Sequence, residues 1–258
     1  MNIFTYNGLC QILGEENVIT YPYHKEYSES SYWELVQLRN QNNYSEQDIV
    51  SMIKRGEFSY SFATPHIDVS RFVSLKDKVD IPPIVAIDGN DKLKNYIKCK
   101  VTFKREIKRE TEEYIPLPFS SYIIDDSRFN NIDDNKKEYD VFFSIWSLSN
   151  KKRELVYNIL RKMKGLKLKL CLYQNGMYKY PLMEYLTLLA KSKISIAISG
   201  AGEDTVRYWE IPSYKTMLIS NERTNIIPNN FIDGEEAVFY NNIEMIPYLI
   251  EGYLKDNK

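Results

Sequence analysis

The stretch that decides the fold runs from residue 194 to residue 220 and reads ISIAISGAGEDTVRYWEIPSYKTMLIS. It begins with an apolar run (194–199), continues through the glycine-rich turn GAG (200–202) and a charged helical segment, and ends in a second apolar run (216–220). A strand, a turn, a helix and a further strand in this order are typical of a βαβ unit, in which the two strands lie parallel in one sheet.

The same alternation extends from residue 140 to the end of the chain. The segment KKRELVYNILRKMKG (151–165) places Leu155, Ile159 and Met163 at helical spacing, and Gly165 is expected to end that helix. The other elements expected here are strands in 139–148, 166–174, 193–199, 216–220 and 237–240, and helices in 181–192, 204–211 and 243–254. This half therefore predicts a parallel sheet that is covered by helices on both faces.

The first half of the chain shows the same alternation of strands and helices in a smaller unit. We expect helices near 5–14, 44–56 and 66–76, and strands in 17–22, 58–63, 83–88, 100–103 and 114–118. Ser45, with Asp48 three residues later, predicts a capped helix start. Residues 120–139 are rich in Asn, Asp, Lys and Ser, which favours a joint. The expected domains are thus 1–120 and 140–258, with a linker at 121–139.

Composition narrows the classes of function. The 34 Lys and Arg residues nearly balance the 35 Asp and Glu residues, so there is no general attraction to nucleic acid or to an anionic membrane. The three cysteines are far apart, which argues against a disulfide framework or a structural zinc site. No window approaches the roughly 18 apolar residues of a membrane span. A soluble cytoplasmic protein is expected, with its oligomeric state left open.

The glycine turn is the first candidate ligand site. Gly200 and Gly202 follow a strand and precede a helix, so the backbone can come close to a ligand and the free N–H groups of the helix start can attract phosphate. The turn is neither a Walker A loop nor a GxGxxG fingerprint. Glycine turns between strand and helix are common, so this feature alone does not identify a site.

Two charged side chains on the following helix add to it. Arg207 and Glu210 are three residues apart and therefore share a face of the helix. They are either a surface ion pair, worth about 0.5 kcal/mol, or a pair in which Arg207 neutralises a diphosphate and Glu210 accepts hydrogen bonds from ribose hydroxyls. Composition does not separate these two interpretations.

Residues 192–221 together with FIDGEEAVFYNNIEMIPYLIEGYL (231–254) resemble the carboxyl-terminal donor domain of GT-B glycosyltransferases, in particular the spore-maturation-protein-like group. The segment YDVFFSIWSLSNKKRELV (139–156) resembles the first strand, loop and helix of that domain. In the family a basic residue there faces the nucleotide phosphates, and Lys152 and Arg153 are the matching residues. Where relatives usually have a glycine, this chain has the serine-rich loop from Ser144 to Ser149. The likeness covers about 140–250 well and 5–120 loosely.

This resemblance implies an α/β protein of the GT-B fold, with two Rossmann-like domains facing a cleft and an abbreviated amino-terminal acceptor domain. It also implies transfer of a sugar from a nucleotide-diphosphate donor to an unidentified acceptor, without a cofactor or a metal. The residues expected at the donor are Lys152, Arg153, Gly200, Gly202, Arg207 and Glu210.

Candidates for the base that takes the acceptor proton lie at the carboxyl ends of strands in the first half. Asp88 ends the strand PIVAID, and His66 follows the strand FSYSFA. Asp88 could instead form an Asx turn closed by Gly89, and His66 could be a helix-start histidine without a catalytic role. Two further functions stay open, a noncatalytic nucleotide-sugar or carbohydrate-binding protein and a GT-B-fold epimerase.

Overall fold

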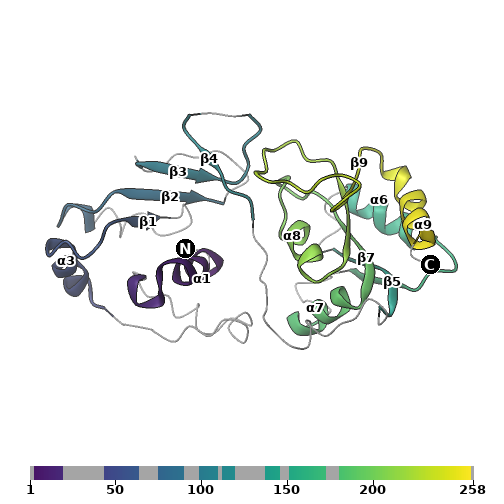
Figure 1. The fold of residues 1–258 in the computed structure, drawn as a ribbon, viewed down its shortest axis with the longest axis horizontal. Coiled ribbons are helices and arrows are strands. Elements are labelled where there is room, and N and C mark those ends of the chain that lie inside the picture. The colour runs from purple at the N-terminus through teal and green to yellow at the C-terminus, as the bar shows by residue number, and fades with distance from the viewer. Residues whose placement is uncertain are drawn as a thin grey trace. The chain divides into compact units, whose positions relative to one another are not determined.

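The computed structural model describes residues 3–19, 44–63, 75–89, 99–109, 112–119, 137–145, 151–172 and 180–256. The chain divides into two compact units, Met1–Pro118 and Phe119–Lys258, shown in Figure 1. Within these described residues, each unit contains one parallel sheet, of four strands in the first and five in the second. The predicted α/β class, with parallel strands in both halves, is confirmed. Residues 121–136 of the expected linker at 121–139 lie outside the described residues.

The first unit is built on a sheet whose strands follow one another in chain order. These strands are β1 (Ser61–Ala63), β2 (Ile84–Asp88), β3 (Val101–Lys104) and β4 (Ile115–Pro116), and each is parallel to its neighbour. The unit also contains α1 (Ile3–Leu13), the 3-10 helix η1 (Glu15–Asn17) and α3 (Glu46–Lys54). The Ser45 hydroxyl accepts from the Asp48 amide and the Asp48 carboxylate accepts from the Ser45 amide, which confirms the predicted cap.

Two other predictions for this unit concern residues 17–22 and 66–76. The expected strand at 17–22 is wrong where it is described, because Asn17 closes η1 and Val18 and Ile19 belong to no strand. The helix expected near 66–76 lies almost entirely outside the described residues.

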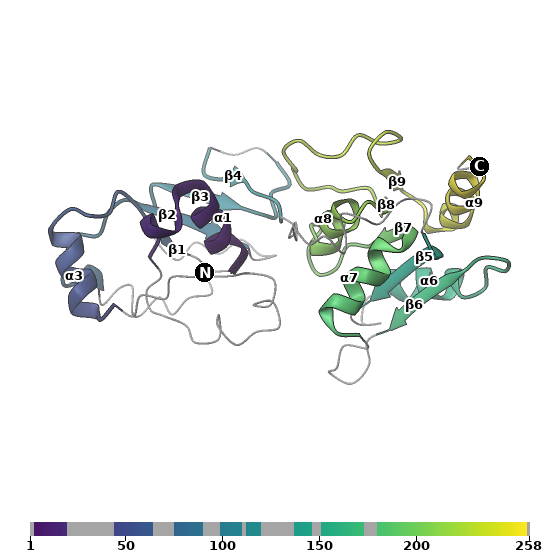
Figure 2. The same cartoon turned by 60° about the horizontal axis from the view of Figure 1, so that its bottom comes forward.

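The second unit has a five-stranded sheet in the order β6-β5-β7-β8-β9, with every neighbouring pair parallel. Its strands are β5 (Tyr139–Ile145), β6 (Leu168–Leu172), β7 (Ser192–Ala197), β8 (Met217–Asn221) and β9 (Val238–Tyr240). Its helices are α6 (Lys151–Leu160), α7 (Leu182–Ala190), α8 (Val206–Ser213) and α9 (Ile246–Asp256), with the 3-10 helix η3 (Ile243–Met245) before α9. Figures 1 and 2 show α7 and α8 on one face of this sheet and α6 and α9 on the other.

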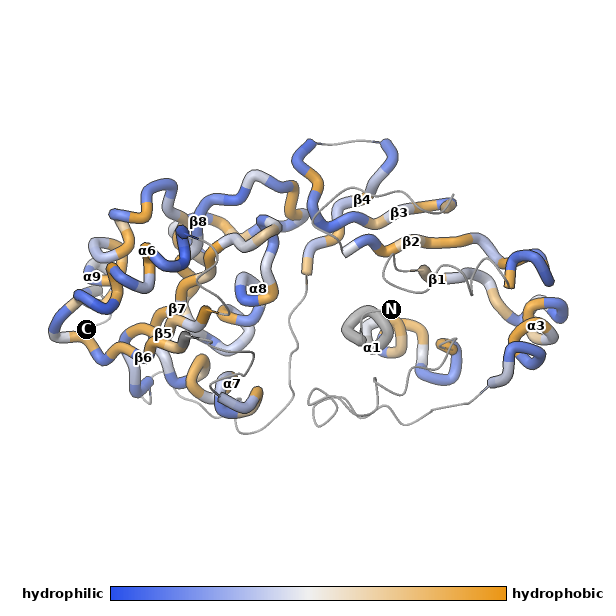
Figure 3. Tube along the Cα trace, turned by 180° about the vertical axis from the view of Figure 1, so that it is seen from behind, coloured by the Kyte–Doolittle hydropathy of each residue, from blue (hydrophilic) through white to orange (hydrophobic). Residues whose placement is uncertain are grey.

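The two faces of this sheet have different side chains, because successive residues of a strand point to opposite sides. Branched and aromatic residues of β5 and β7 pack with α6 and α9 in one core, and Figure 3 shows how hydrophobic these central strands are. The core includes Val141, Phe143, Ile145, Ile194 and Ile196 from the strands and Val156, Leu160, Ile246 and Ile250 from the helices. The alternate residues toward α7 and α8 include small polar ones, Ser144, Ser195 and Ser220.

The predicted face of α6 needs correction. Val156 and Leu160 are fully buried, whereas Leu155 is 53% exposed and Met163 lies beyond the end of the helix. The helix ends at Leu160, and Gly165 instead takes a positive φ of 78° in the turn that leads into β6. Four apolar residues, at 155, 156, 159 and 160, fit two overlapping helical stripes, and only packing on the sheet selects one of them.

Strand order determines where a ligand could bind. From β5 the chain moves outward to β6, then crosses back to β7 on the other side of β5. In sheets of this kind ligands bind beyond the carboxyl ends of the strands at the point where the direction of winding reverses. In this unit that point lies between the ends of β5 and β7. Among the helices of the described residues, none is long and apolar enough to cross a membrane.

Candidate functional site

Two arginines from opposite faces of the sheet meet at this reversal point. Arg153, in the first turn of α6, donates from Nη2 to the carbonyl oxygen of Ile198, just after β7, at 3.3 Å. Arg207, in the first turn of α8, donates from Nη2 to the hydroxyl of Ser144, near the end of β5, at 3.4 Å. Each arginine therefore reaches the strand end that lies across the crevice from its own helix start.

The two positive charges influence each other. Burial lowers the pKa of the Arg153 guanidinium, and the nearby charge of Arg207 lowers it further. An arginine stays protonated through such a shift, so both charges persist at neutral pH. Within the part of the chain that the structure describes, Arg153 has a carbonyl acceptor but no carboxylate at ion-pair distance. Like charges held together and partly shielded from water favour an anion between them.

Gly200 leaves room for the guanidinium group of Arg153. A Cβ at residue 200 would stand 2.8 Å from Nη2 of Arg153, closer than such atoms normally approach. The absence of a side chain therefore lets the guanidinium lie against the backbone of the turn. Gly202 contributes through its backbone, because its carbonyl accepts from the Gly200 amide at 2.9 Å and closes the turn.

Glu210 lies on the same face of α8 as Arg207, as its spacing predicts, and contacts a helix that the sequence pattern did not implicate. The hydroxyl of Tyr185, on α7, donates to Oε2 of Glu210 at 3.0 Å. The ring of Tyr185 faces Arg207, whose Cζ is 5.7 Å from the ring centroid, and such a contact is worth about 0.5–2 kcal/mol. Burial raises the pKa of Glu210, while Arg207 and the Tyr185 hydroxyl act in the opposite direction.

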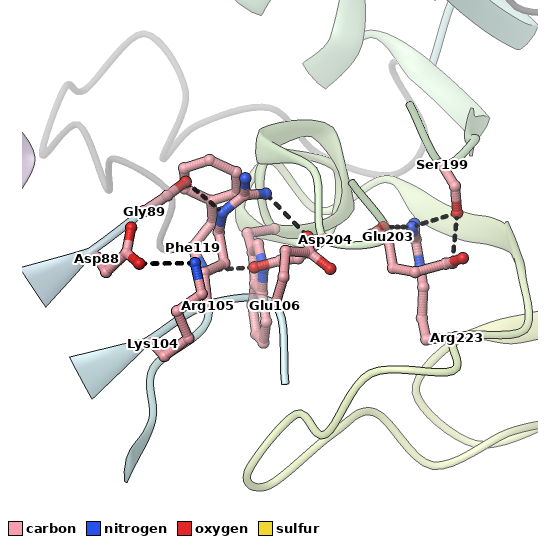
Figure 4. Close-up of polar contacts among 11 residues, drawn as sticks. Asp88, Gly89, Lys104, Arg105, Glu106, Phe119, Ser199, Glu203, Asp204 and Arg223 are labelled. Atoms are coloured by element: carbon pink, nitrogen blue, oxygen red, sulfur yellow. Dashed lines mark hydrogen bonds and ion pairs between the residues drawn. The ribbon is translucent and has the colours of Figure 1, made fainter. Parts of the chain in front are cut away.

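The glycine turn is held from the side of β8 by a polar network, part of which Figure 4 shows. The side chain of Asn221 accepts from the Ser199 amide at 2.9 Å. Arg223 donates to the Ser199 hydroxyl at 2.9 Å and to the carbonyl of Glu203, and its guanidinium carbon lies 4.5 Å from the centroid of the Tyr208 ring. Burial lowers the pKa of Arg223. The turn is therefore shaped by fixed partners before any ligand binds.

The start of α8 has no side-chain cap from its N-cap residue. Thr205 occupies the N-cap position with extended backbone, but its side chain makes no capping hydrogen bond. Asp204 is buried and is not a cap, since its two carboxylate oxygens accept from the Trp209 indole at 2.8 Å and from the Phe119 amide at 2.6 Å. The first amides of α8 thus have no side-chain cap from Thr205.

The remaining predicted residues fall in three places. Lys152 is exposed on α6 next to Arg153, and no described contact brings it to the glycine turn. His66 lies outside the described residues, as do residues 146–150 between β5 and α6. Asp88 belongs to the first unit, at the end of β2.

Asp88 is part of a buried ion pair, drawn in Figure 4. Its Oδ2 is 2.8 Å from Nζ of Lys104, which ends the adjacent strand β3 and whose side chain has no exposed surface. The next residues are tied together as well, because Arg105 donates from Nε to the carbonyl of Gly89 at 3.0 Å. The Lys104 ammonium thus already occupies one oxygen of the carboxylate that the sequence suggested as a base.

The motif Asp233-Gly234-Glu235-Glu236 has a local role in the structure. Asp233 accepts from the Phe239 amide at 2.8 Å, and Glu236 accepts from the Ile232 amide at 2.9 Å. Gly234 has a positive φ of 78° and donates its amide to the carbonyl of Ala237. These contacts form the turn that leads into β9.

No family model matches the sequence, and no curated protein matches it either. Among the described residues, no group of three or more His, Cys, Asp or Glu side chains is placed to hold a metal ion.

Sequence reasoning named Arg153, Gly200, Arg207 and Glu210, and the structure brings these four together in one unit. It missed Tyr185 and Arg223. Tyr185 was visible only as a polar position on an amphipathic helix, and Arg223 only as a charge after the strand TMLIS. Strand order would have been the useful signal, since it places α7 beside α8 and the end of β8 beside the glycine turn.

Proposed function

We propose that the second unit binds the diphosphate of a nucleotide sugar at the reversal point of its sheet, and that the protein is a glycosyltransferase of the GT-B type. The observation that carries this proposal is the convergence of Arg153 and Arg207 beside Gly200 at the ends of β5 and β7. A departing nucleoside diphosphate carries negative charge that these guanidinium groups would stabilise.

The ribose contact would come from Glu210. Its Oε2 is held by Tyr185, and among contacts within the described residues Oε1 is left to accept hydrogen bonds from a ligand. The two parallel sheets in two units fit the GT-B resemblance at the level of fold class. The cationic charge offered to the donor is supplied here by arginine side chains, so we expect binding to survive chelation of divalent metals.

Donor binding is tested with UDP, GDP, CDP and dTDP and their sugars, by thermal unfolding and calorimetry. A ligand at about 100 times its Kd stabilises the folded state by about 2.7 kcal/mol. Arg153→Met and Arg207→Met should each weaken binding roughly 10- to 100-fold, the loss of one charge-assisted contact, whereas Arg161→Met, an exposed arginine just after α6, should not. If none of these nucleotides stabilises the protein, the donor site is refuted.

A noncatalytic nucleotide-sugar-binding protein is the second candidate, because the carboxylate proposed as base, Asp88, is already paired with Lys104. Slow hydrolysis of the bound nucleotide sugar, measured with and without EDTA, separates the two candidates. Release of free sugar supports the transferase. Binding without turnover, even in the presence of a range of sugar and lipid acceptors, supports the binding protein.

A further inference from the structure

We propose that Tyr185 is a positioning residue of the anion site, which holds Arg207 through its ring and Glu210 through its hydroxyl. This inference rests on the proposed function, and it deepens that proposal by adding a residue from a third helix. Arg207 and Glu210 are both on α8, whereas Tyr185 comes from α7, which packs beside α8 on the same face of the sheet (Figure 2).

The geometry gives Tyr185 two separate contacts with the pair. Its hydroxyl donates to Oε2 of Glu210 at 3.0 Å, and its ring centroid lies 5.7 Å from Cζ of Arg207. Without the hydroxyl, Glu210 could turn toward Arg207, and a direct ion pair would take the guanidinium away from an incoming phosphate. The tyrosine therefore holds the carboxylate of Glu210 apart from the guanidinium of Arg207, so that the two side chains of one helix can contact different parts of a ligand.

The ring itself is anchored to the sheet. It lies against Phe142, with ring centroids 5.6 Å apart and planes tilted by 52°. Phe142 is two residues before Ser144, which accepts the hydrogen bond from Arg207. One side of β5 thus fixes both the ring and the end of the arginine side chain, so the position of Tyr185 relative to the reversal point is set by the strand.

The charged and titratable groups that face Glu210 are few in the described structure. On its own helix Arg207 acts on it, and from α7 the Tyr185 hydroxyl does. Arg153, from α6, acts on Arg207. When the hydroxyl is removed and Glu210 pairs directly with Arg207, the closer positive charge stabilises the carboxylate more strongly, and the pKa of Glu210 falls back toward its ordinary value.

The test uses the full chain and two variants at this position. Tyr185→Phe keeps the ring and removes the hydroxyl, and Tyr185→Leu removes both contacts. Tyr157→Phe is the matched control, a partly buried tyrosine of α6 that packs on the core of the same unit. Binding of inorganic pyrophosphate is measured by calorimetry at pH 7.5, and carbon-13 NMR follows the titration of the Glu210 carboxyl, assigned with Glu210→Gln.

We expect Tyr185→Phe to weaken pyrophosphate binding about 3- to 10-fold and to lower the titration midpoint of Glu210, with Tyr185→Leu weakening binding more. The control should match the wild type in both measurements. If the wild type binds pyrophosphate and both variants bind it equally well, the role of Tyr185 is refuted while the proposed function stands. If the wild type binds neither pyrophosphate nor any of the four nucleotides, the proposed function fails and this role fails with it.

Discussion

Nη2 of Arg153 lies 2.8 Å from the point where a Cβ on residue 200 would stand. Because the clashing atom is the free end of a long side chain, Gly200→Ala should displace the guanidinium and leave the backbone of the turn in place. We predict a change in unfolding free energy below about 1 kcal/mol together with about 10-fold weaker pyrophosphate binding, measured by calorimetry.

The control for this substitution is Gly252→Ala, in α9, where a Cβ would meet no atom within 4 Å. It should stabilise the protein by about 0.5–1 kcal/mol and leave binding unchanged, because alanine is the better helix former. A Gly200→Ala variant that binds as tightly as the wild type would show that the position of Arg153 has no part in the site.

The carboxyl of Glu210 predicts a pH dependence of stability. Burial raises its pKa, so the folded state keeps a proton on this group to a higher pH than the unfolded chain does. The stability linked to that proton is present at low pH and is lost as pH rises through the raised pKa. Glu210→Gln should therefore melt at a higher temperature than the wild type at pH 8, and the difference should shrink toward pH 4.

The exposed Glu251 of α9 provides the comparison, since Glu251→Gln should shift the melting temperature little at either pH. A Glu210→Gln variant that is less stable than the wild type at pH 8 would mean that the contacts with Arg207 and Tyr185 outweigh burial.

The buried pair of Asp88 and Lys104 predicts a large effect in the first unit. Asp88→Asn leaves the Lys104 ammonium buried without its carboxylate, which should cost about 3–5 kcal/mol of unfolding free energy in denaturant titration. Replacing both residues, Asp88→Leu with Lys104→Met, should recover most of that loss. The exposed pair of Arg55 and Glu57 offers the contrast, since Glu57→Gln should cost less than about 1 kcal/mol.

The stability of these variants decides how a measurement of their sugar transfer is interpreted. A loss of sugar transfer in Asp88→Asn supports a base only if the variant stays folded at the assay temperature. Transfer that persists in the stable double variant would remove Asp88 from the chemistry.

Arg223 should matter for the shape of the glycine turn. Arg223→Met removes its hydrogen bonds to the Ser199 hydroxyl and to the carbonyl of Glu203, together with one to the Ser220 hydroxyl at 2.9 Å. We predict a loss of about 2–4 kcal/mol in unfolding free energy and weaker nucleotide binding. Arg223→Lys should recover only part of the stability and only part of the nucleotide binding, because a single ammonium group cannot reproduce the several N–H donors of the planar guanidinium. Nucleotide binding at full strength in Arg223→Met would show that the turn keeps its shape without this residue.

Sequence alone predicted the order of the elements of the second unit well, because strands buried on both sides are continuous apolar runs, but it placed the end of α6 too late in the chain. It could not give contacts between distant residues. The hydrogen bond from Arg207 to Ser144 joins residues 63 apart in the sequence, and the one from Arg153 to Ile198 joins residues 45 apart. Both depend on the order of the strands in the sheet. The buried partner of Asp88 was missed for the same reason, since Lys104 reads locally as one of several charges after a strand.

In the small first unit, a local helix cap was predictable from the sequence, whereas the ends of the strands were not. Its capped helix α3 was predictable from four residues, since the cap is a local interaction. Its strands are only two to five residues long, so their ends depended on pairing with neighbours more than on their own pattern.

The placement of the two arginines has a thermodynamic consequence. One belongs to the helix layer of α6 and α9 and the other to the layer of α7 and α8, so an anion bound by both would tie the two layers together across the end of the sheet. Occupancy would then raise the free energy of every local opening that separates either arginine from the strands. Amide hydrogen exchange should consequently slow at the start of α6 and at the start of α8 together, although the two helices share no face of the sheet.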